Sequence, residues 1–352
     1  MSHATGAETP HDPASEGRSE IVIDRAALRA NVRRLAGALR EAELWAVVKA
    51  DGYGHGALTV AETALDEGAR ALCVATVGEA LELRGSLPAA RIIVLGPTGD
   101  DQHRPAREAR LELVVSEPPW PEGVPLHVKV DTGMGRWGLA EVAASSPDLV
   151  GLMSHLASAD FDPVFTEQQI ARFAEIAERH PGLTRHLANS AGILRFPAAR
   201  FDAGRAGIAL YGLSPFGHDP ADDGLQPVLS WRSRLAQVKQ LAPGESTGYG
   251  RRFLAAEPTW IGIVPVGYAD GFRRDLEGTE VLVDGVPRPV IGTISMDSFA
   301  VRLDRPLSVG TSVTLIGDGL LAEAHSAVAG TITYELACGI NSSSARARRT
   351  VL

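Results

Sequence analysis

The sequence predicts an α/β protein in which a parallel (β/α)8 barrel, of the TIM type, is followed by a C-terminal all-β domain. Two observations support this fold class. Short apolar strand candidates alternate with helical stretches up to about residue 204, and beyond Gly224 the chain changes to short β-rich runs broken by turns. We therefore divide the 352 residues into a flexible polar tail (1–18), a barrel (19–225) and a β domain (226–352).

The barrel region begins with a short strand at 21–24 and a helix at 25–40, for which Asp24 is the expected N-cap. Eight apolar segments then read as the barrel strands: 44–49, 71–75, 91–95, 112–116, 126–131, 149–154, 184–187 and 201–204. Helical spacing separates most of them, at 55–67, 77–84, 100–110, 139–145, 165–179 and 190–196. We prefer a closed barrel to an open sheet because closure leaves no exposed edge strand.

The crossover after the fourth predicted barrel strand and the C-terminal β domain differ from the strand–helix alternation of the barrel. The segment between Ser116 and Leu126 is too short and too rich in proline for a helix, so we expect a loop there. In the β domain, turns such as Asp284-Gly285 separate the expected strands. These are 234–241, 259–266, 280–283, 288–294, 298–303 and 312–317.

Composition narrows the class of protein. A net charge of -9 without long basic or acidic runs argues against nucleic acid as a partner. Cys73 and Cys338, the two cysteines, lie among apolar residues, which predicts a reducing compartment, and we expect a cytoplasmic protein. No window of about 18 apolar residues predicts a membrane span, and no Cys/His spacing predicts a metal site.

Polar residues gather where the predicted barrel strands end, which is the face that carries the active site in such barrels. They are Lys49, the segment 131–136, His155, the pair Asn189-Ser190, and Arg205. Lys49 ends a buried strand, where lost hydration favours the neutral amine and hence a Schiff-base former. Taken alone, such a lysine more often only marks the point where a strand reaches solvent.

A phosphate site is expected beside this lysine. The segments 188–192 and 204–208 supply small residues and backbone amides at helix N-termini, which suit a phosphate group. The sequence has no Cys/His spacing that predicts a metal site. An amine next to a phosphate cradle therefore predicts pyridoxal 5'-phosphate (PLP) bound to Lys49.

Six motifs, in order along the chain, closely resemble those of the alanine racemases. They are AVVKADGYGHG (46–56), KVDTGMGR (129–136), GLMSHLA (151–157), NSAG (189–192), GYADG (267–271) and SMD (295–297). The resemblance implies a PLP-dependent fold-type III enzyme that interconverts L- and D-alanine and supplies D-alanine for peptidoglycan. It also implies a head-to-tail homodimer, with each active site shared between a barrel and the partner's β domain.

The resemblance assigns two bases, one to each face of the substrate. Lys49 would act on D-alanine, and Tyr249 of the other subunit would act on L-alanine. His155 would connect that tyrosine to Arg205, although by itself it could be an ordinary buried histidine. Arg205 would face the pyridine nitrogen and, being permanently charged, keep it unprotonated.

The remaining site residues also follow from the resemblance. Tyr53, Ser190, Gly207, Ile208 and Tyr334 would hold the phosphate. Arg136 and the amide of Met296 would bind the substrate carboxylate, with Asp297 in a supporting role. Lys129 matches a position that is often carbamylated in the family, and a lysine in a buried strand needs either a partner or loss of its charge.

Departures and rival interpretations limit these assignments. Thr293 stands where many relatives have arginine, and the segment 342–349 departs from the family's usual ending. A broad-specificity or serine racemase would share every motif named above. A decarboxylase of the same barrel type would need a different glycine-rich loop and a reactive cysteine near the β-domain site. A non-catalytic PLP-binding protein would be a lone barrel without Tyr249.

Overall fold

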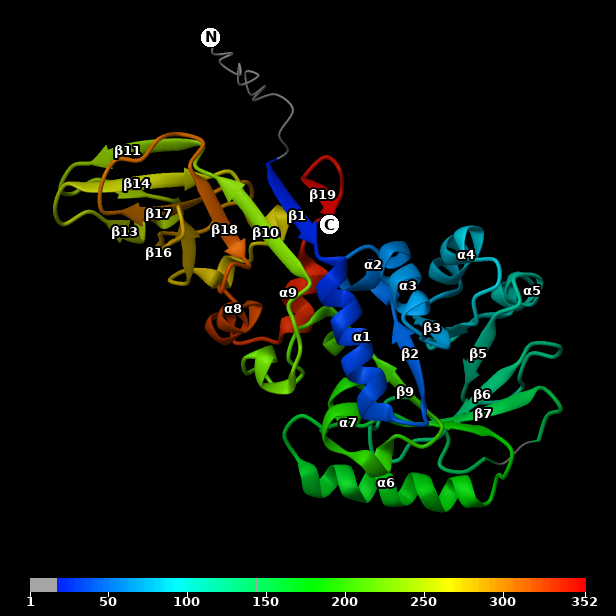
Figure 1. Cartoon of the computed structure of the whole chain (residues 1–352). Coiled ribbons are helices and arrows are strands. Elements are labelled where there is room, and N and C mark those ends of the chain that lie inside the picture. Colours follow the sequence, from blue (N-terminus) through cyan, green and yellow to red (C-terminus); the bar gives the residue numbers. More distant parts are fainter. Residues whose placement is uncertain (1–17, 143–144) are drawn as a thin grey trace, which may run out of the picture. The chain divides into compact units, whose positions relative to one another are not determined.

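The computed structural model describes residues 18–142 and 145–352 (Figure 1). These residues form two compact units. One unit contains residues 23–229, 321–339 and 351–352, and the other contains residues 18–22, 230–320 and 340–350. The larger unit is a barrel and the smaller one is built around a β-sheet.

The larger unit is a closed barrel of eight parallel strands, which confirms the predicted fold class. The first and last strands pair with each other and so complete the ring. The strands are β2 (Glu43–Val47), β3 (Ala71–Val74), β4 (Ile92–Val94), β5 (Glu112–Val115), β6 (Leu126–Lys129), β7 (Leu149–Met153), β8 (Thr184–His186) and β9 (Ala203–Ala206). Every residue in β3, β4 and β6 is buried, as expected for parallel strands covered on both faces.

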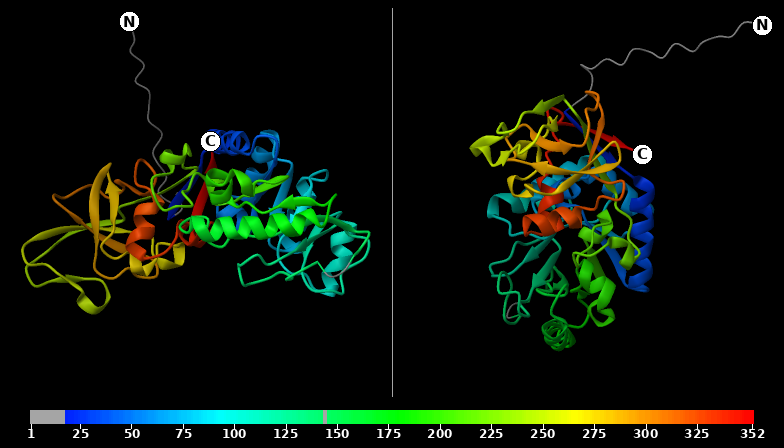
Figure 2. Two further views of the ribbon diagram at one scale, coloured as in Figure 1. Left: turned by 90° about the horizontal axis from the view of Figure 1, so that it is seen from below. Right: turned by 90° about the vertical axis from the view of Figure 1, so that its left-hand side faces the viewer.

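Helices surround the barrel strands, and Figure 2 shows α6 along the outside of this unit in both views. The helices are α1 (Arg25–Leu39), α2 (Lys49–Tyr53), α3 (Ala57–Asp66), α4 (Val77–Ser86), α5 (Asp100–Glu108), α6 (Pro163–Glu178), α7 (Ser190–Arg195), α8 (Ala322–Ala329) and α9 (Thr333–Gly339). Short 3-10 turns follow at η1 (Pro197–Ala199), η2 (Ile208–Tyr211) and η3 (Pro220–Asp223).

Local chemistry explains where the helices begin. The carboxylate of Asp24 accepts the amides of Ala26 and Ala27 at 2.7 and 3.0 Å, and so caps α1 as the sequence predicts. In α4, Thr76 and Glu79 form a reciprocal capping box. Each cap satisfies backbone donors that have no partner inside the helix.

The helix predicted at 139–145 does not form in the part of it that the structure describes. Leu139 instead makes an isolated bridge with Val130, and its amide bonds to the carbonyl of Lys129 at 2.9 Å. Residues 143–144 lie outside the described part of the chain. The crossover between β5 and β6 is a loop, as its prolines predict.

The smaller unit is organised by a nine-stranded sheet. Its strands, in spatial order, are β11 (Gln237–Leu241), β14 (Thr259–Val264), β17 (Phe299–Leu303), β16 (Val286–Ile291), β15 (Glu280–Val283), β18 (Ser312–Ile316), β10 (Leu229–Arg234), β1 (Ser19–Ile23) and β19 (Ala347–Val351). A hairpin of β12 (Ser246–Thr247) and β13 (Phe253–Leu254) stands apart from it, and the 3-10 turns are η4 (Tyr249–Arg251), η5 (Tyr268–Asp270) and η6 (Arg274–Leu276). The run predicted as one strand at 234–241 is divided in the structure, because β10 ends at Arg234 and β11 begins at Gln237.

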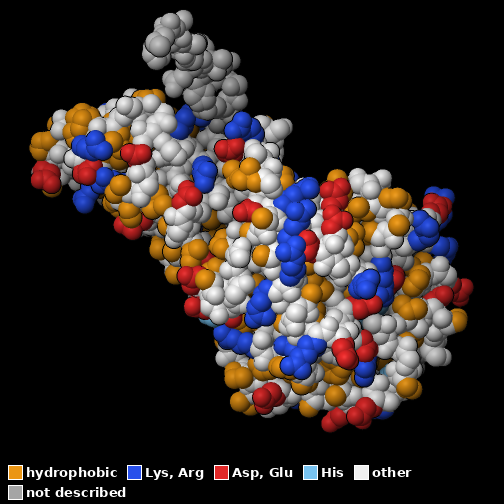
Figure 3. Space-filling model, viewed as in Figure 1, with side chains coloured by type: hydrophobic (Ala, Val, Ile, Leu, Met, Phe, Trp, Pro, Cys, Tyr) orange, Lys and Arg blue, Asp and Glu red, His pale blue; other side chains and the backbone are white. Residues whose placement is uncertain are grey.

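Charge on the surface is mixed. Figure 3 shows basic and acidic side chains interspersed over the face in view. On the outside of α1, for example, Arg29 and Arg33 both pair with Glu67, at 3.5 and 2.6 Å. This mixture agrees with the absence of long charge runs in the sequence.

Candidate active site

A cavity of about 710 Å³ opens at the carboxyl ends of the barrel strands. Residues far apart in sequence meet there because parallel strands bring their carboxyl ends to one face of the barrel. Most of the side chains predicted for the site line this cavity: Lys49, Tyr53, Lys129, Arg136, His155, Ser190, Arg205, Gly207, Ile208 and Tyr334. All of them belong to the barrel unit.

Lys49 lies beyond the end of β2 and begins an unusual turn. The sequence predicted that the strand runs to Lys49, but β2 ends at Val47. The next residues form a turn of left-handed helix, with φ and ψ of 53° and 53° at Ala50, 51° and 44° at Asp51, and 60° and 45° at Gly52. Tyr53 continues it with a φ of 53°. One turn therefore carries both the predicted Schiff-base lysine and a predicted phosphate ligand.

The predicted phosphate cradle is closely packed. Ser190 Oγ accepts the amide of Gly207 at 2.9 Å and that of Ala209 at 3.3 Å. A Cβ on Gly207 would lie 2.7 Å from the hydroxyl of Tyr53, so only glycine allows this approach. The Tyr53 ring stacks on Tyr211 at 4.8 Å. These contacts place two hydroxyls and a backbone amide in one small region.

Arg205 is a buried cation in the barrel interior. It lies within β9 rather than after a strand ending at Gly204, as the sequence predicted, because that strand runs from Ala203 to Ala206. Its guanidinium donates to the carbonyls of Ser154, His186 and Leu187 at 2.8, 2.7 and 3.1 Å. Burial lowers the pKa of Arg205 to about 10, so the group remains charged at neutral pH.

Two histidines contact this guanidinium. Arg205 Nη2 lies 3.1 Å from His155 Nδ1, and Arg205 Nη1 lies 2.8 Å from His186 Nδ1. Burial and the charge of Arg205 hold the pKa of both histidines well below the usual range. Both rings are therefore neutral at physiological pH, and each can accept a hydrogen bond from the arginine.

The chain of polar contacts continues through residues that the sequence analysis missed. His186 Nε2 lies 2.9 Å from His127 Nδ1, and His127 Nε2 lies 2.7 Å from Glu112 Oε2. Glu112 also receives two bonds from Arg91, at 2.7 and 2.9 Å. A sequence signal was available, because His127 lies two residues before Lys129 and must share its face of the strand.

Glu112 anchors the far end of this chain as a carboxylate. Burial acts to raise the pKa of Glu112, but hydrogen bonds from His127 and Arg91 outweigh it and bring the pKa to about 2. Gly151 leaves room for the arrangement, since a Cβ there would lie 1.9 Å from His127 Nδ1. The interior of the barrel thus holds a connected polar network rather than a purely apolar core.

Lys129 and Arg136 meet at an aromatic ring. Lys129 Nζ lies 5.4 Å and Arg136 Cζ 5.1 Å from the centre of the Trp137 ring. Burial and the neighbouring charges of Arg136 and Arg205 lower the pKa of Lys129 to about 8. The loop that presents Arg136 is folded around Asp131, whose carboxylate accepts the amides of Gly133, Met134 and Gly135.

The lining of the cavity suits an anionic cofactor such as PLP. Its charged side chains are four cations, Lys49, Lys129, Arg136 and Arg205, and none of the described lining residues is Asp or Glu. Burial raises the pKa of the Tyr53 and Tyr334 phenols, so both are neutral hydroxyl donors. A phosphate in the cradle would receive these hydroxyls together with the Ser190 hydroxyl and the Ile208 amide, beside the Gly207 amide that donates to Ser190 Oγ.

Three predicted residues lie in the β-sheet unit instead. Tyr249, Met296 and Asp297 belong to that unit, and the first two are exposed, at 73% and 51%. The Tyr249 carbonyl accepts a bond from the Thr293 hydroxyl at 2.8 Å. Arg346 Nη1 holds Asp297 Oδ1 at 2.6 Å, and this ion pair lowers the pKa of Asp297.

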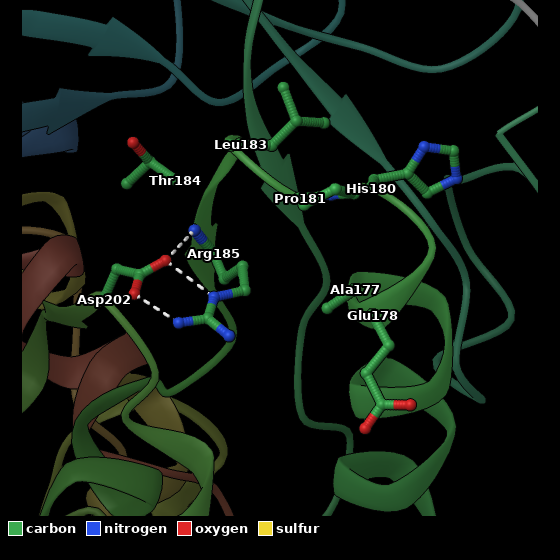
Figure 4. Close-up of a pocket in the computed structure, with 9 residues that line it drawn as sticks. Ala177, Glu178, His180, Pro181, Leu183, Thr184, Arg185 and Asp202 are labelled. Atoms are coloured by element: carbon green, nitrogen blue, oxygen red, sulfur yellow. Dashed lines mark hydrogen bonds and ion pairs between the residues drawn. The ribbon is translucent and has the colours of Figure 1, made fainter.

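A second pocket opens beside the amino ends of β8 and β9. Figure 4 shows Arg185 and Asp202 paired at its wall, with Nη2 to Oδ1 at 2.6 Å and Nε to Oδ2 at 2.8 Å. Glu178 and His180 line the other side. Because Arg185 and Asp202 already satisfy each other, and because the amino ends of barrel strands usually serve stability, we do not assign a ligand to this pocket.

Within residues 18–142 and 145–352, no cluster of three or more His, Cys, Asp or Glu side chains could hold a metal ion. The same part of the chain contains no helix that is long and apolar enough to cross a bilayer.

Comparison with known proteins identifies the family. Residues 23–215 match the alanine racemase N-terminal domain, and residues 228–349 match the alanine racemase C-terminal domain. Over 350 residues the chain is 39% identical to the alanine racemase of Listeria monocytogenes serotype 1/2a (strain 10403S), covering 91% of this chain and 95% of that protein.

Solved structures agree. The alanine racemase from Streptomyces coelicolor A3(2) superposes with a TM-score of 0.88 at 38% identity, covering 95% of this chain and 98% of that one. The biosynthetic alanine racemase from Pseudomonas aeruginosa gives a TM-score of 0.89 at 34% identity, covering 96% and 99%. The chain therefore belongs to the alanine racemase family of isomerases.

Proposed function

We propose that this protein is a PLP-dependent enzyme that interconverts L- and D-alanine and supplies D-alanine for peptidoglycan. One observation carries the proposal. Lys49 shares a cavity with a phosphate cradle and three further cations, in a chain whose family is that of the alanine racemases. An amine alone would not be specific, but an amine beside sites for a phosphate and a carboxylate matches the ligands of an amino acid racemase.

Different residues of the cavity would bind different parts of the cofactor. Tyr53, Ser190, Tyr334 and the backbone of Gly207 and Ile208 would bind the phosphate, and Lys49 would bind the aldehyde carbon. Arg205 would donate a hydrogen bond to the ring nitrogen and so leave it unprotonated. When bound, PLP withdraws electrons from the substrate Cα and so makes its proton removable.

Racemisation requires proton transfer on both faces of the substrate Cα. Lys49 removes the Cα proton of D-alanine, and Tyr249 removes that of L-alanine from the opposite face. Tyr249 comes from the other subunit of a homodimer, and His155 donates its Nε2–H to the Tyr249 oxygen. The contact with Arg205 supports this direction, because a neutral imidazole that accepts from the guanidinium at Nδ1 carries its proton on Nε2.

The substrate carboxylate needs its own partners. Arg136 and the backbone amide of Met296 bind it, and Asp297 supports the loop that carries Met296. Lys129 is carbamylated, which turns a cation into an anion beside Arg136 and orients that guanidinium. Its lowered pKa supports the modification, since only a neutral amine reacts with carbon dioxide.

A racemisation assay tests the proposal. We expect the purified protein to interconvert the alanine enantiomers and to carry a visible PLP absorbance that borohydride removes. Lys49→Ala and Tyr249→Phe should each lower kcat by about a hundredfold or more, as loss of a catalytic acid or base does. L-Serine and L-lysine in the same assay define substrate breadth. Absence of alanine racemisation in a PLP-loaded protein would refute the proposal.

A further inference from the structure

Glu79 of α4 joins two of the loops that line the cavity. Its Oε1 accepts the amide of Ala50 at 2.7 Å, and its Oε2 accepts the amides of Ala75 and Thr76 at 2.7 and 3.2 Å. Ala50, Ala75 and Thr76 all line the cavity together with Lys49. The glutamate's own amide bonds to Thr76 Oγ1 at 3.2 Å, which fixes the start of α4 beneath the carboxylate.

The loop on the Oε1 side is strained. Five consecutive residues from Ala50 to Gly54 have positive φ, and Ala50, Asp51 and Tyr53 are not glycine. L-amino acids disfavour a left-handed helical turn because Cβ approaches the following carbonyl oxygen. Such a conformation persists only where surrounding contacts hold it in place.

Internal bonds hold part of this turn. Gly52 N bonds to Val48 O at 2.9 Å, and Gly54 N bonds to Ala50 O at 3.1 Å. The amide of Ala50, at the start of the turn, bonds instead to Glu79. Ala50, the residue after Lys49, is thus hydrogen-bonded to the side chain of Glu79 in α4. Tyr53 lies three residues further along the same turn.

We propose that Glu79 is a positioning residue that holds the left-handed turn in the conformation in which Lys49 and Tyr53 reach the same ligand. The inference rests on the proposed function, because it names what aims the PLP-binding amine. The two carboxylate oxygens accept hydrogen bonds from different loops: Oε1 from the turn at Ala50, and Oε2 from the loop at Ala75 and Thr76. Glutamine retains a single carbonyl oxygen, so it can serve only one loop and turns an N–H toward the donors of the other.

Hydrogen exchange tests this role in the full-length protein, with and without added PLP. In Glu79→Gln and Glu79→Ala, the amides of residues 49–56 should exchange about tenfold or more faster than in wild type, the effect of losing a hydrogen bond to a charged acceptor. Glu82→Gln is the matched control, because Glu82 lies on the same helix with its side chain exposed. Unchanged exchange in both Glu79 variants would overturn the proposal.

PLP affinity gives a second readout. We expect the dissociation constant for PLP to rise about tenfold or more in Glu79→Gln, with a matching fall in the rate at which borohydride traps PLP on Lys49. An unaltered affinity combined with a general loss of thermal stability would mean that Glu79 serves only the fold, against the proposal.

Relief of strain supplies an independent check. Ala50→Gly keeps the amide but removes the Cβ that disfavours a positive φ. The double variant Glu79→Gln/Ala50→Gly should therefore recover part of the lost PLP affinity, and a double variant no better than Glu79→Gln would contradict the strain argument. If wild type fails to bind PLP, the proposed function is wrong. Hydrogen exchange in residues 49–56 still tests whether Glu79 holds the left-handed turn.

Discussion

Four cationic side chains share one cavity, and burial lowers the pKa of two of them, Arg205 and Lys129. Arg205 keeps its charge because a guanidinium with a pKa of about 10 is still protonated at neutral pH. Lys129, with a pKa of about 8, is partly neutral under the same conditions. The cavity thus holds a permanently charged Arg205 and a Lys129 that can lose its charge. These properties fit the roles proposed for them, Arg205 as the donor to the ring nitrogen and Lys129 as the carbamylated lysine.

Carbamylation of Lys129 should depend on pH. Only the neutral amine reacts with carbon dioxide, so occupancy should be high at pH 8 to 9 and fall as the pH drops below about 8. Carbon-13 NMR with labelled bicarbonate would show a carbamate signal in wild type that Lys129→Ala lacks. If wild type gives no such signal even at pH 9, Lys129 is an unmodified amine and the proposed orientation of Arg136 fails.

The carboxylate of Glu112 should stabilise the folded protein in a defined pH range. Its pKa falls from 4.5 to about 2 on folding, so its contribution is fully present above pH 4.5 and is lost as the pH falls toward 2. Glu112→Gln should cost about 3 kcal/mol of unfolding free energy at pH 7 and much less near pH 2. Urea denaturation at both pH values measures this, with Glu117→Gln, an exposed position, as the control.

The site could be predicted in part from single residues. Lys49, His155 and Ser190 were found because the sequence places polar residues at strand ends, and strand ends meet in a barrel. His127, His186 and Glu112 were missed, because a polar residue inside a short buried strand resembles any other until its partner strands are known. Glu79 was missed for a different reason. Its role is to accept backbone amides, and backbone contacts leave no motif in the side chains.

At the scale of elements, the strands and helices with strong periodicity were predicted to within a few residues, and the failures have identifiable causes. The segment 139–145 has apolar residues at helical spacing, yet Leu139 bonds back to β6 and the chain forms a loop. The left-handed turn after β2 could not be predicted, because Ala50 and Asp51 give no sign of a positive φ.

The turn between β9 and η2 should not tolerate a side chain. Gly207→Ala would place a Cβ 2.7 Å from the Tyr53 hydroxyl, so one of the two must move and the phosphate cradle should open. We expect PLP affinity to fall about tenfold, which absorbance titration measures. A Gly207→Ala protein that binds PLP like wild type would show that the cradle does not hold the phosphate.

A glycine-to-alanine substitution in helix α1 should stabilise the protein. Gly37 lies in α1, where an added Cβ meets no atom within 4 Å. Gly37→Ala should therefore raise the unfolding free energy by about 0.5 to 1 kcal/mol, because alanine loses less backbone entropy on folding. The denaturation midpoint in urea measures this gain. A lower midpoint would mean that α1 is not a regular helix at this position.

At the scale of the whole molecule, the predicted site residues are distributed over two units. The barrel unit carries Lys49 and the cofactor ligands, whereas Tyr249, Met296 and Asp297 belong to the β-sheet unit. The sequence motifs revealed both sets of residues, and the copy of the protein that supplies each set is a property of the assembly. The proposed homodimer answers this by pairing the barrel of one copy with the β-sheet unit of the other.

Subunit complementation tests this central claim. Lys49→Ala and Tyr249→Phe are each expected to be nearly inactive, but a mixed dimer has one site with an intact Lys49 from one subunit and an intact Tyr249 from the other. After the two variants are unfolded and refolded together, with mixed dimers verified by native mass spectrometry, alanine racemisation should return to about a quarter of the wild-type level. If mixed dimers form and activity stays at the level of the separate variants, the two bases do not come from different subunits, and the account is contradicted.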